Sequence, residues 1–141
     1  MPVVGVIGAG QLARMMQPAA IALGIGIKVF AESEGSSAHQ AVTKVGDINN
    51  FEQLLEFSKT VDVITFDHEH VPTAILQQLE AAGMLVRPGS NALKHAQNKL
   101  TMRRKLAELG LPQPIWQAAK TASDISEFLQ NNAPKIVVKT P

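Results

Sequence analysis

The sequence predicts an α/β fold with a parallel sheet and helices on both faces. Two observations carry this prediction. Short β-branched apolar runs alternate between Val3 and Pro88 with segments that carry apolar residues at helical spacing. Glycines and prolines punctuate the chain between these runs. This alternation is typical of βαβ units, which are joined by right-handed crossovers and build a parallel sheet.

Apolar, β-branched residues mark the candidate strands of this sheet. The clearest are 3–7 (VVGVI), which a Gly-Ala-Gly turn ends, and 61–66 (VDVITF). Continuous apolar runs of this kind are typical of strands that are buried on both faces of a parallel sheet. In chain order, the expected strands are residues 3–7, 27–31, 42–45, 61–66 and 84–86.

Three segments between these strands show helical periodicity. The first, 11–24, contains Pro18, which predicts a kink or local break because proline lacks the N–H of the helical hydrogen bond. The second, 51–57, follows Asn50, a favoured N-cap residue. The third, 72–83, begins with a proline and ends in a glycine, as helices commonly do.

The pattern changes after Pro88. Helices are expected over 90–97, 98–109 and 123–129, the last capped by Ser123, and short strands are expected at 115–118 and 135–140. Because this second part ends on an apolar strand, we expect the sequence to be a truncated piece of a longer protein. The predicted domains are residues 1–97 and residues 98–141.

Composition argues against several classes of protein. Thirteen Lys and Arg residues against 12 Asp and Glu residues leave a net charge of +1, too weak for a general nucleic-acid or anionic-membrane footprint. No apolar run approaches the roughly 20 residues that span a bilayer, and no basic leader precedes the first strand. Cysteine is absent, which removes disulfides and thiolate metal sites and fits a cytoplasmic location.

The turn after the first strand is a candidate anion site. Gly8-Ala9-Gly10-Gln11-Leu12-Ala13 fits G-x-G-x-x-[GA] between a strand and a helix, where unpaired N–H groups and the helix dipole favour an anion. Two alternatives stay open. With Glu32 as the acidic partner, Gly8 and Gly10 would bind NAD in a Rossmann oxidoreductase; otherwise the glycines only make a tight turn.

Asp67-His68-Glu69-His70 follows the strongest strand. Ligands of parallel sheets bind at the carboxyl ends of the strands, so we expect a carboxylate here to meet a polar ligand. A solvated loop and a metal site are the alternatives, although the histidine spacing does not match the helical H-x-x-x-H pair.

Two sets of basic residues are candidates for anion binding. For those of 99–105, a solvated helix face is as good an explanation as a binding role. Lys139 stands inside an apolar run, where an ammonium group must be paired or reach an anion.

Four segments occur in an order that matches a known family. They are G-A-G-Q-L-A-R-M-M (8–16), T-F-D-H-E-H-V-P (65–72), A-Q-N-K-L-T-M-R-R-K-L-A-E-L-G-L-P (96–112) and I-V-V-K-T (136–140). The chain resembles the N-terminal part of the N5-carboxyaminoimidazole ribonucleotide synthases, the ATPase subunits of phosphoribosylaminoimidazole carboxylase. These are ATP-grasp enzymes of purine biosynthesis. The resemblance implies a Rossmann-like pre-ATP-grasp domain, followed by the start of an ATP-grasp domain.

The resemblance also implies a reaction and a set of binding residues. The family joins ATP, bicarbonate and 5-aminoimidazole ribonucleotide into N5-carboxyaminoimidazole ribonucleotide, ADP and phosphate, through carboxyphosphate. The residues that it implies for the ribonucleotide are Gly10, Gln11, Leu12 and Glu69, and those for the ATP phosphates are Lys99 and Lys139.

By the same resemblance, the complete enzyme is a homodimer that uses ATP and Mg²⁺ and binds no dinucleotide. The phosphate-covering loop and the Mg²⁺ carboxylates of the family would follow Pro141. We therefore expect this chain alone to hold no cofactor tightly, to contain no metal site and to lack synthase activity. Asn98 departs from the aspartate that the family usually has there, although asparagine caps a helix comparably.

Overall fold

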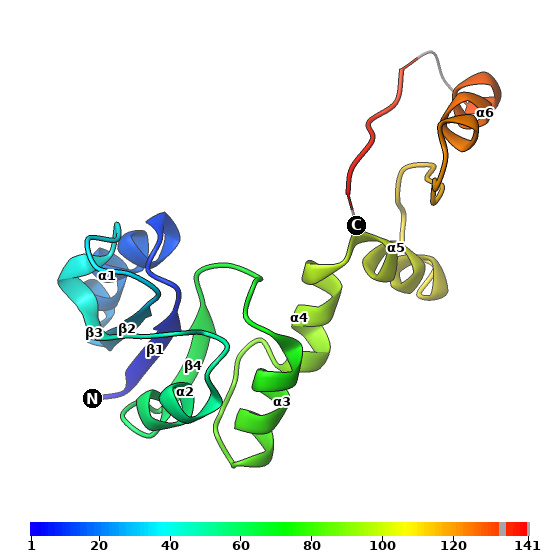
Figure 1. The fold of residues 1–141 in the computed structure, drawn as a ribbon. Coiled ribbons are helices and arrows are strands. Elements are labelled where there is room, and N and C mark those ends of the chain that lie inside the picture. The colour runs from blue at the N-terminus through cyan, green and yellow to red at the C-terminus, as the bar shows by residue number, and fades with distance from the viewer. Residues whose placement is uncertain (133–134, 141) are drawn as a thin grey trace. The chain divides into compact units, whose positions relative to one another are not determined.

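The computed structural model describes residues 1–132 and 135–140. These form two units, Met1–Leu93 and Lys94–Pro141, and Figure 1 shows the elements of both. The predicted terminal strand, 135–140, lies inside the described ranges, whereas Pro141 lies outside them. A domain boundary after residue 97 stays a prediction.

The first unit is built around a four-stranded parallel sheet. Its strand order is β3-β2-β1-β4, and its strands are β1 (Val3–Ile7), β2 (Gly26–Ala31), β3 (Val42–Val45) and β4 (Val63–Phe66). Four of the five predicted strands of this unit are thus confirmed. The fifth, residues 84–86, is reduced to a single parallel bridge between Ile64 and Val86. Pro88 follows closely and has no N–H to extend a ladder.

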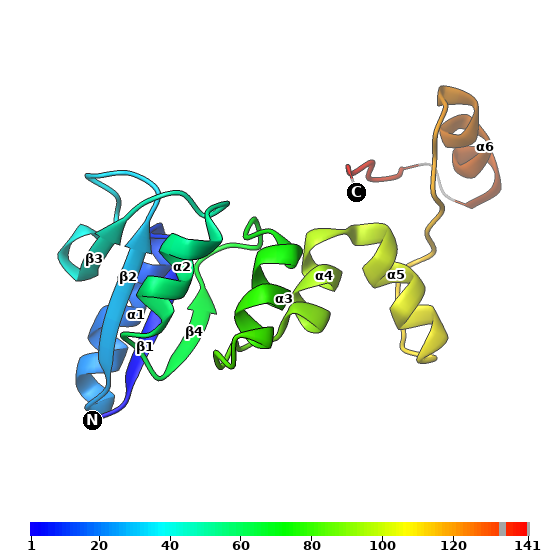
Figure 2. The same ribbon diagram turned by 60° about the horizontal axis from the view of Figure 1, so that its bottom comes forward.

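Helices cover both faces of this sheet, as predicted (Figure 2). Successive strand residues point to opposite faces, so Val6 packs with α1 (Gln11–Leu23) while Ile7 packs with α2 (Phe51–Ser58) and α3 (Thr73–Ala81). A short 3₁₀ turn, η1 (His39–Ala41), precedes β3. The buried core is mostly aliphatic. Its two buried aromatic residues, Phe30 and Phe57, contact each other with their ring centroids 5.6 Å apart.

Helix α1 runs without a break through Pro18, so of the predicted kink or local break, the break does not occur and the kink stays a prediction. Ala13 and Ala20 are buried on either side of the proline and hold both halves of the helix against the sheet, while the proline itself is exposed. Gly24 ends the helix with a φ of 64°, a left-handed conformation that glycine adopts without steric cost.

The regular secondary structure that the described residues of the second unit form is helical. Its helices are α5 (Lys99–Glu108) and α6 (Ala122–Asn132), and α4 (Ser90–Gln97) crosses the boundary between the units. The strands predicted at 115–118 and 135–140 are wrong: both segments lack strand structure. A strand needs a neighbour that accepts its backbone hydrogen bonds, and no described residue pairs with either segment. Val137 is 80% exposed as a result.

Helix α6 begins with a cap that differs from the predicted Ser123. Thr121 Oγ1 accepts from Asp124 N at 3.2 Å, and the Asp124 carboxylate accepts in return from Thr121 N at 2.8 Å. This reciprocal pair is a capping box, two residues earlier than the predicted cap. None of the helices in the described ranges combines the length and the apolar character that crossing a membrane demands.

Candidate functional site

Three loops meet at the carboxyl edge of the sheet. They follow β1, β2 and β4, which are neighbours in the order β2-β1-β4. The loop after β1 leads into α1 and contains the glycine turn 8–10. In open α/β sheets this edge is where ligands bind, so the predicted ribonucleotide residues lie where the fold favours a site.

The carboxylate of Asp67 joins the loop after β4 to the start of α1. Its Oδ2 accepts from Gly10 N at 2.6 Å, and its Oδ1 accepts from Ala13 N at 2.6 Å. The N-cap residue of α1 is Gly10, which has no side chain to cap the helix. Asp67 therefore supplies the cap from a loop, 57 residues away from Gly10 in sequence.

The two glycines of the turn make room for the loop after β4. A Cβ on Gly8, whose φ is +97°, would lie 2.9 Å from Asp67 Cβ and from His68 Cδ2. A Cβ on Gly10 would overlap Asp67 Oδ2. Both glycines thus admit a neighbouring loop of the same chain, which the glycine motif alone does not reveal.

His68 joins the loop after β4 to the loop after β2. Its Nε2 lies 3.2 Å from Glu32 Oε2, and its Nδ1 accepts from His70 N at 3.3 Å. The tautomer that lets Nδ1 accept this bond has its N–H at Nε2, which then donates a hydrogen bond to the Glu32 carboxylate. Glu32, the predicted acidic partner of a dinucleotide, is therefore bonded to a histidine of this chain.

The metal alternative for this loop has no support in the structure. In the ranges that the structure describes, no group of three or more His, Cys, Asp or Glu side chains is arranged to hold a metal ion.

The structure brings the predicted ribonucleotide residues to one edge. Gln11 and Leu12 are exposed in the first turn of α1, Leu12 to 57%, and Glu69 is exposed two residues after Asp67. The bond from Gly10 N to Asp67 holds the two segments together. Sequence analysis named Asp67 in the segment after the strand but missed that its carboxylate bonds to the start of α1; the available signal was a carboxylate directly after the strand that neighbours β1.

The predicted ATP residues lie in the second unit. Lys99 is exposed in the first turn of α5, behind Asn98, whose Oδ1 accepts from Thr101 N at 2.9 Å and caps the helix as expected. Lys139 is exposed in the extended segment 135–140. The prediction that this ammonium lies inside an apolar strand is wrong, because the strand does not form.

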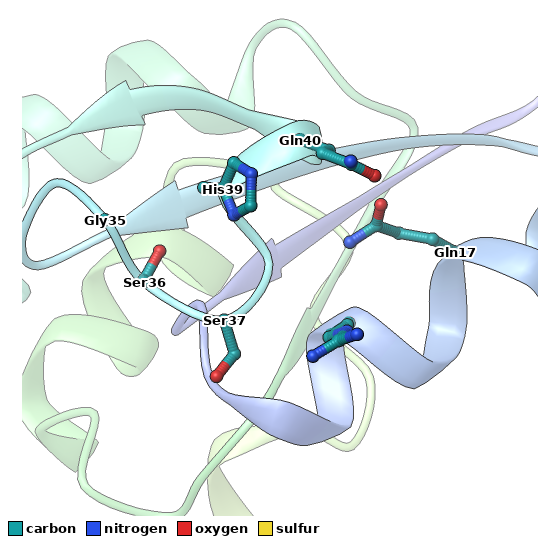
Figure 3. A pocket seen from close by; sticks show the side chains of 7 residues that line it. Gln17, Gly35, Ser36, Ser37, His39 and Gln40 are labelled. Atoms are coloured by element: carbon teal, nitrogen blue, oxygen red, sulfur yellow. The ribbon is translucent and has the colours of Figure 1, made fainter.

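A polar hollow of about 290 Å³ lies between α1 and the loop after β2. The hydroxyl oxygen of Ser36 is buried there, and no described group forms a hydrogen bond with it. Figure 3 shows the amide groups of Gln17 and Gln40 facing each other across the hollow. No sequence motif marks the hollow, because its lining residues come from two separate parts of the chain. Those from α1 are Arg14 and Gln17, and those that follow β2 are Gly35, Ser36, Ser37, His39 and Gln40.

Residues 1–97 match the family described as the ribonucleotide synthetase preATP-grasp domain. The chain belongs to this family. It is 43% identical to the N5-carboxyaminoimidazole ribonucleotide synthase of Corynebacterium ammoniagenes over 141 residues, which are 99% of this chain and 34% of the relative. The family assignment confirms both the predicted resemblance and the predicted α/β, pre-ATP-grasp fold of this domain.

Solved structures of N5-carboxyaminoimidazole ribonucleotide synthetases are similar to this chain in fold. The N5-carboxyaminoimidazole ribonucleotide synthetase of Thermotoga maritima matches with a TM-score of 0.78 and 30% identity, over 91% of this chain and 36% of that chain. The Aspergillus clavatus synthase, in complex with ADP and 5-aminoimidazole ribonucleotide, matches with a TM-score of 0.75 and 28% identity, over 92% and 35%. The chain thus spans about one third of the length of these relatives.

Proposed function

We propose that the chain is the N-terminal part of an ATP-dependent ligase of de novo purine biosynthesis, which carboxylates 5-aminoimidazole ribonucleotide with bicarbonate to N5-carboxyaminoimidazole ribonucleotide. The observation that carries this proposal is the 43% identity to such a synthase along nearly the whole chain. A relative of the same fold is in complex with ADP and this ribonucleotide. The proposal places the enzyme in the cytoplasm as a homodimer.

The carboxyl edge of the sheet holds the ribonucleotide in this proposal. Gly10, Gln11 and Leu12 present the first turn of α1, and the Gln11 amide can both donate and accept hydrogen bonds. The exposed carboxylate of Glu69 accepts from the exocyclic amine of the aminoimidazole. The bonds of Asp67 to α1 keep these two segments at a fixed separation, which favours binding because little order is lost when the ligand arrives.

Lys99 and Lys139 hold the phosphates of ATP in this proposal. Both ammonium groups are exposed and act as fixed cations against phosphate charge. A bicarbonate oxygen attacks the γ-phosphorus and ADP leaves; the amine then attacks the carboxyl carbon of carboxyphosphate and phosphate leaves. Mg²⁺ neutralises phosphate charge in such transfers, and we assign none of the described residues to it because none forms a metal-binding cluster.

The alternative of an NAD-dependent oxidoreductase has less support. A dinucleotide fingerprint directs the N–H groups of the glycine turn at the pyrophosphate, but two of these groups, on Gly10 and Ala13, donate to Asp67. The ribose of NAD needs a free acidic residue after the second strand, but Glu32 is bonded to His68.

Titration calorimetry with the two ligands separates these functions. We expect the chain to bind 5-aminoimidazole ribonucleotide and not NADH. Glu69→Gln should weaken ribonucleotide binding, because an amide presents one acceptor oxygen and no charge to the amine. Glu56→Gln is the matched control, since Glu56 is exposed on α2 and bonded to Lys44 at 3.0 Å. Binding of NADH without binding of the ribonucleotide would contradict the proposal.

In a full-length ligase that carries this chain, the two sites should separate kinetically. Glu69→Ala should raise the Michaelis constant for the ribonucleotide and leave that for ATP unchanged, whereas Lys139→Ala should do the reverse. Steady-state rates at varied concentrations of each substrate measure both. If both variants shift the same Michaelis constant, the assigned division between the two substrates is wrong.

A further inference from the structure

The glycine turn of this chain has the pattern of a phosphate cradle, but the cradle is already filled. In such turns, N–H groups at the start of a helix point at an anion, and the helix dipole adds to the attraction. In this chain the N–H groups of Gly10 and Ala13 point at the two carboxylate oxygens of Asp67, both at 2.6 Å. A backbone N–H group that donates to a carboxylate forms a charge-assisted hydrogen bond.

The fold holds this carboxylate firmly in the turn. Asp67 N donates to Ile7 O at 2.9 Å, so the backbone of Asp67 continues the pairing of β4 with β1. Gly10 has space for Oδ2 only because it lacks a Cβ. Three points of attachment therefore fix the side chain: the pairing to β1 and the two N–H groups of α1.

Two further carboxylates lie on the loops of the same edge. Glu32 is bonded to His68, the residue after Asp67, and Glu69 is exposed on the same loop as Asp67. These carboxylates add to the negative charge of the edge on which the turn lies.

We propose that Asp67 is an internal substitute for a ligand phosphate: it fills the anion cradle of α1 and makes this turn reject phosphate groups. Asp67 is thus a specificity-determining residue, and the glycines serve the chain's own carboxylate. This inference concerns what the turn excludes, and it requires that the ribonucleotide of the proposed function meet this turn with a group other than its phosphate.

Removal of the carboxylate should open the cradle to inorganic phosphate. In Asp67→Ala, the N–H groups of Gly10 and Ala13 become free, and we expect phosphate to bind there with an affinity that rises roughly 2- to 30-fold over that of the unaltered chain, the range typical of an anion at a helix N-terminus. Titration with sodium phosphate, followed by the amide NMR signals of these two residues, measures the gain.

Asp62→Ala is the matched control. Asp62 stands before the other end of β4, its Oδ2 accepts from Val3 N at 2.6 Å, and its own N donates to Val3 O at 2.9 Å. It therefore makes the same kind of attachment to β1 as Asp67 does, away from any helix N-terminus. Asp62→Ala should bind phosphate no better than the unaltered chain.

Asp67→Asn provides a second variant if the alanine variant does not fold. It keeps the shape of the side chain and removes the charge, so we expect a smaller gain in phosphate binding at the same two amides. The proposal is overturned if the unaltered chain binds phosphate at these amides, if the folded Asp67 variants show no gain, or if Asp62→Ala gains equally. No ribonucleotide is used, so this test and the test of the proposed function fail separately.

Discussion

Gly10→Ala is the most direct test of how the glycine turn is built. The backbone of Gly10 has φ −79° and ψ −159°, a conformation that alanine adopts without strain. The added methyl group, however, would overlap Asp67 Oδ2. The substitution therefore displaces the carboxylate and leaves the local backbone conformation available.

The loss of stability follows from the bonds that break. Displacing Asp67 removes its hydrogen bonds from Gly10 N and Ala13 N, and hydrogen bonds to charged groups contribute about 1.5–3 kcal/mol each. Asp67 is half-buried, so water replaces part of this energy. We expect the free energy of unfolding of the first unit to fall by about 2–4 kcal/mol.

Hydrogen exchange of the β1 amides is the suitable assay. The chain has one tryptophan, Trp116, which lies in the second unit, so tryptophan fluorescence would not report on the sheet. Exchange under native conditions gives the free energy of opening for each protected amide. The difference between the variant and the unaltered chain is the predicted loss.

A double-mutant cycle with Asp67→Ala separates the overlap from any other effect of the methyl group. Once the carboxylate is gone, Gly10→Ala should cost less than about 1 kcal/mol, the difference between glycine and alanine at an N-cap position. The two substitutions should therefore be coupled by about 1–3 kcal/mol. Strictly additive losses would refute the argument that Gly10 makes room for Asp67.

Three further predictions concern stability. Leu76 is fully buried between α3 and the sheet, so Leu76→Ala should lower the free energy of unfolding by about 2–5 kcal/mol, measured by exchange of the sheet amides. Hydrogen bonds from the hydroxyl and the N–H of Ser90 lower the pKa of Glu80. The ionised carboxylate therefore stabilises the folded chain above the ordinary pKa of 4.5, and this contribution is lost as pH falls through the lowered pKa. Glu80→Gln removes the titrating group, so the free energy of unfolding should fall less steeply below about pH 4.5. Thr121→Ala should destabilise α6 by about 0.5–2 kcal/mol, seen as faster exchange in its first turns, whereas unchanged exchange would contradict the capping box.

The parts of the fold that depend on local sequence were predictable. The strands at 3–7 and 42–45 form as expected, and so do the helix that Asn50 caps and the helix that Asn98 caps. In each case the signal lies within a few neighbouring residues: β-branched runs ended by turn residues, or a capping side chain before an apolar period.

The predictions that failed depend on partners distant in sequence. Residues 135–140 have the composition of a strand, but composition does not supply a neighbour, and without one the segment stays extended and exposed. Pro18 lowers helix propensity locally, yet tertiary burial of Ala13 and Ala20 keeps α1 continuous. For the site, the sequence placed Gln11 and Glu69 at one edge; it did not reveal the bond of Asp67 that joins their segments.

The glycine fingerprint is ambiguous for the same physical reason. A G-x-G-x-x-A turn offers N–H groups to whatever anion lies nearest, and the six residues themselves do not say whether that anion is a ligand or the chain. Which anion lies nearest to the turn depends on the residue that follows the neighbouring strand. In a sheet of order β2-β1-β4, the residue directly after β4 lies beside the turn after β1, and here that residue is Asp67, bonded to the turn. The carboxylate at that position here fits the proposal that the chain itself fills the cradle.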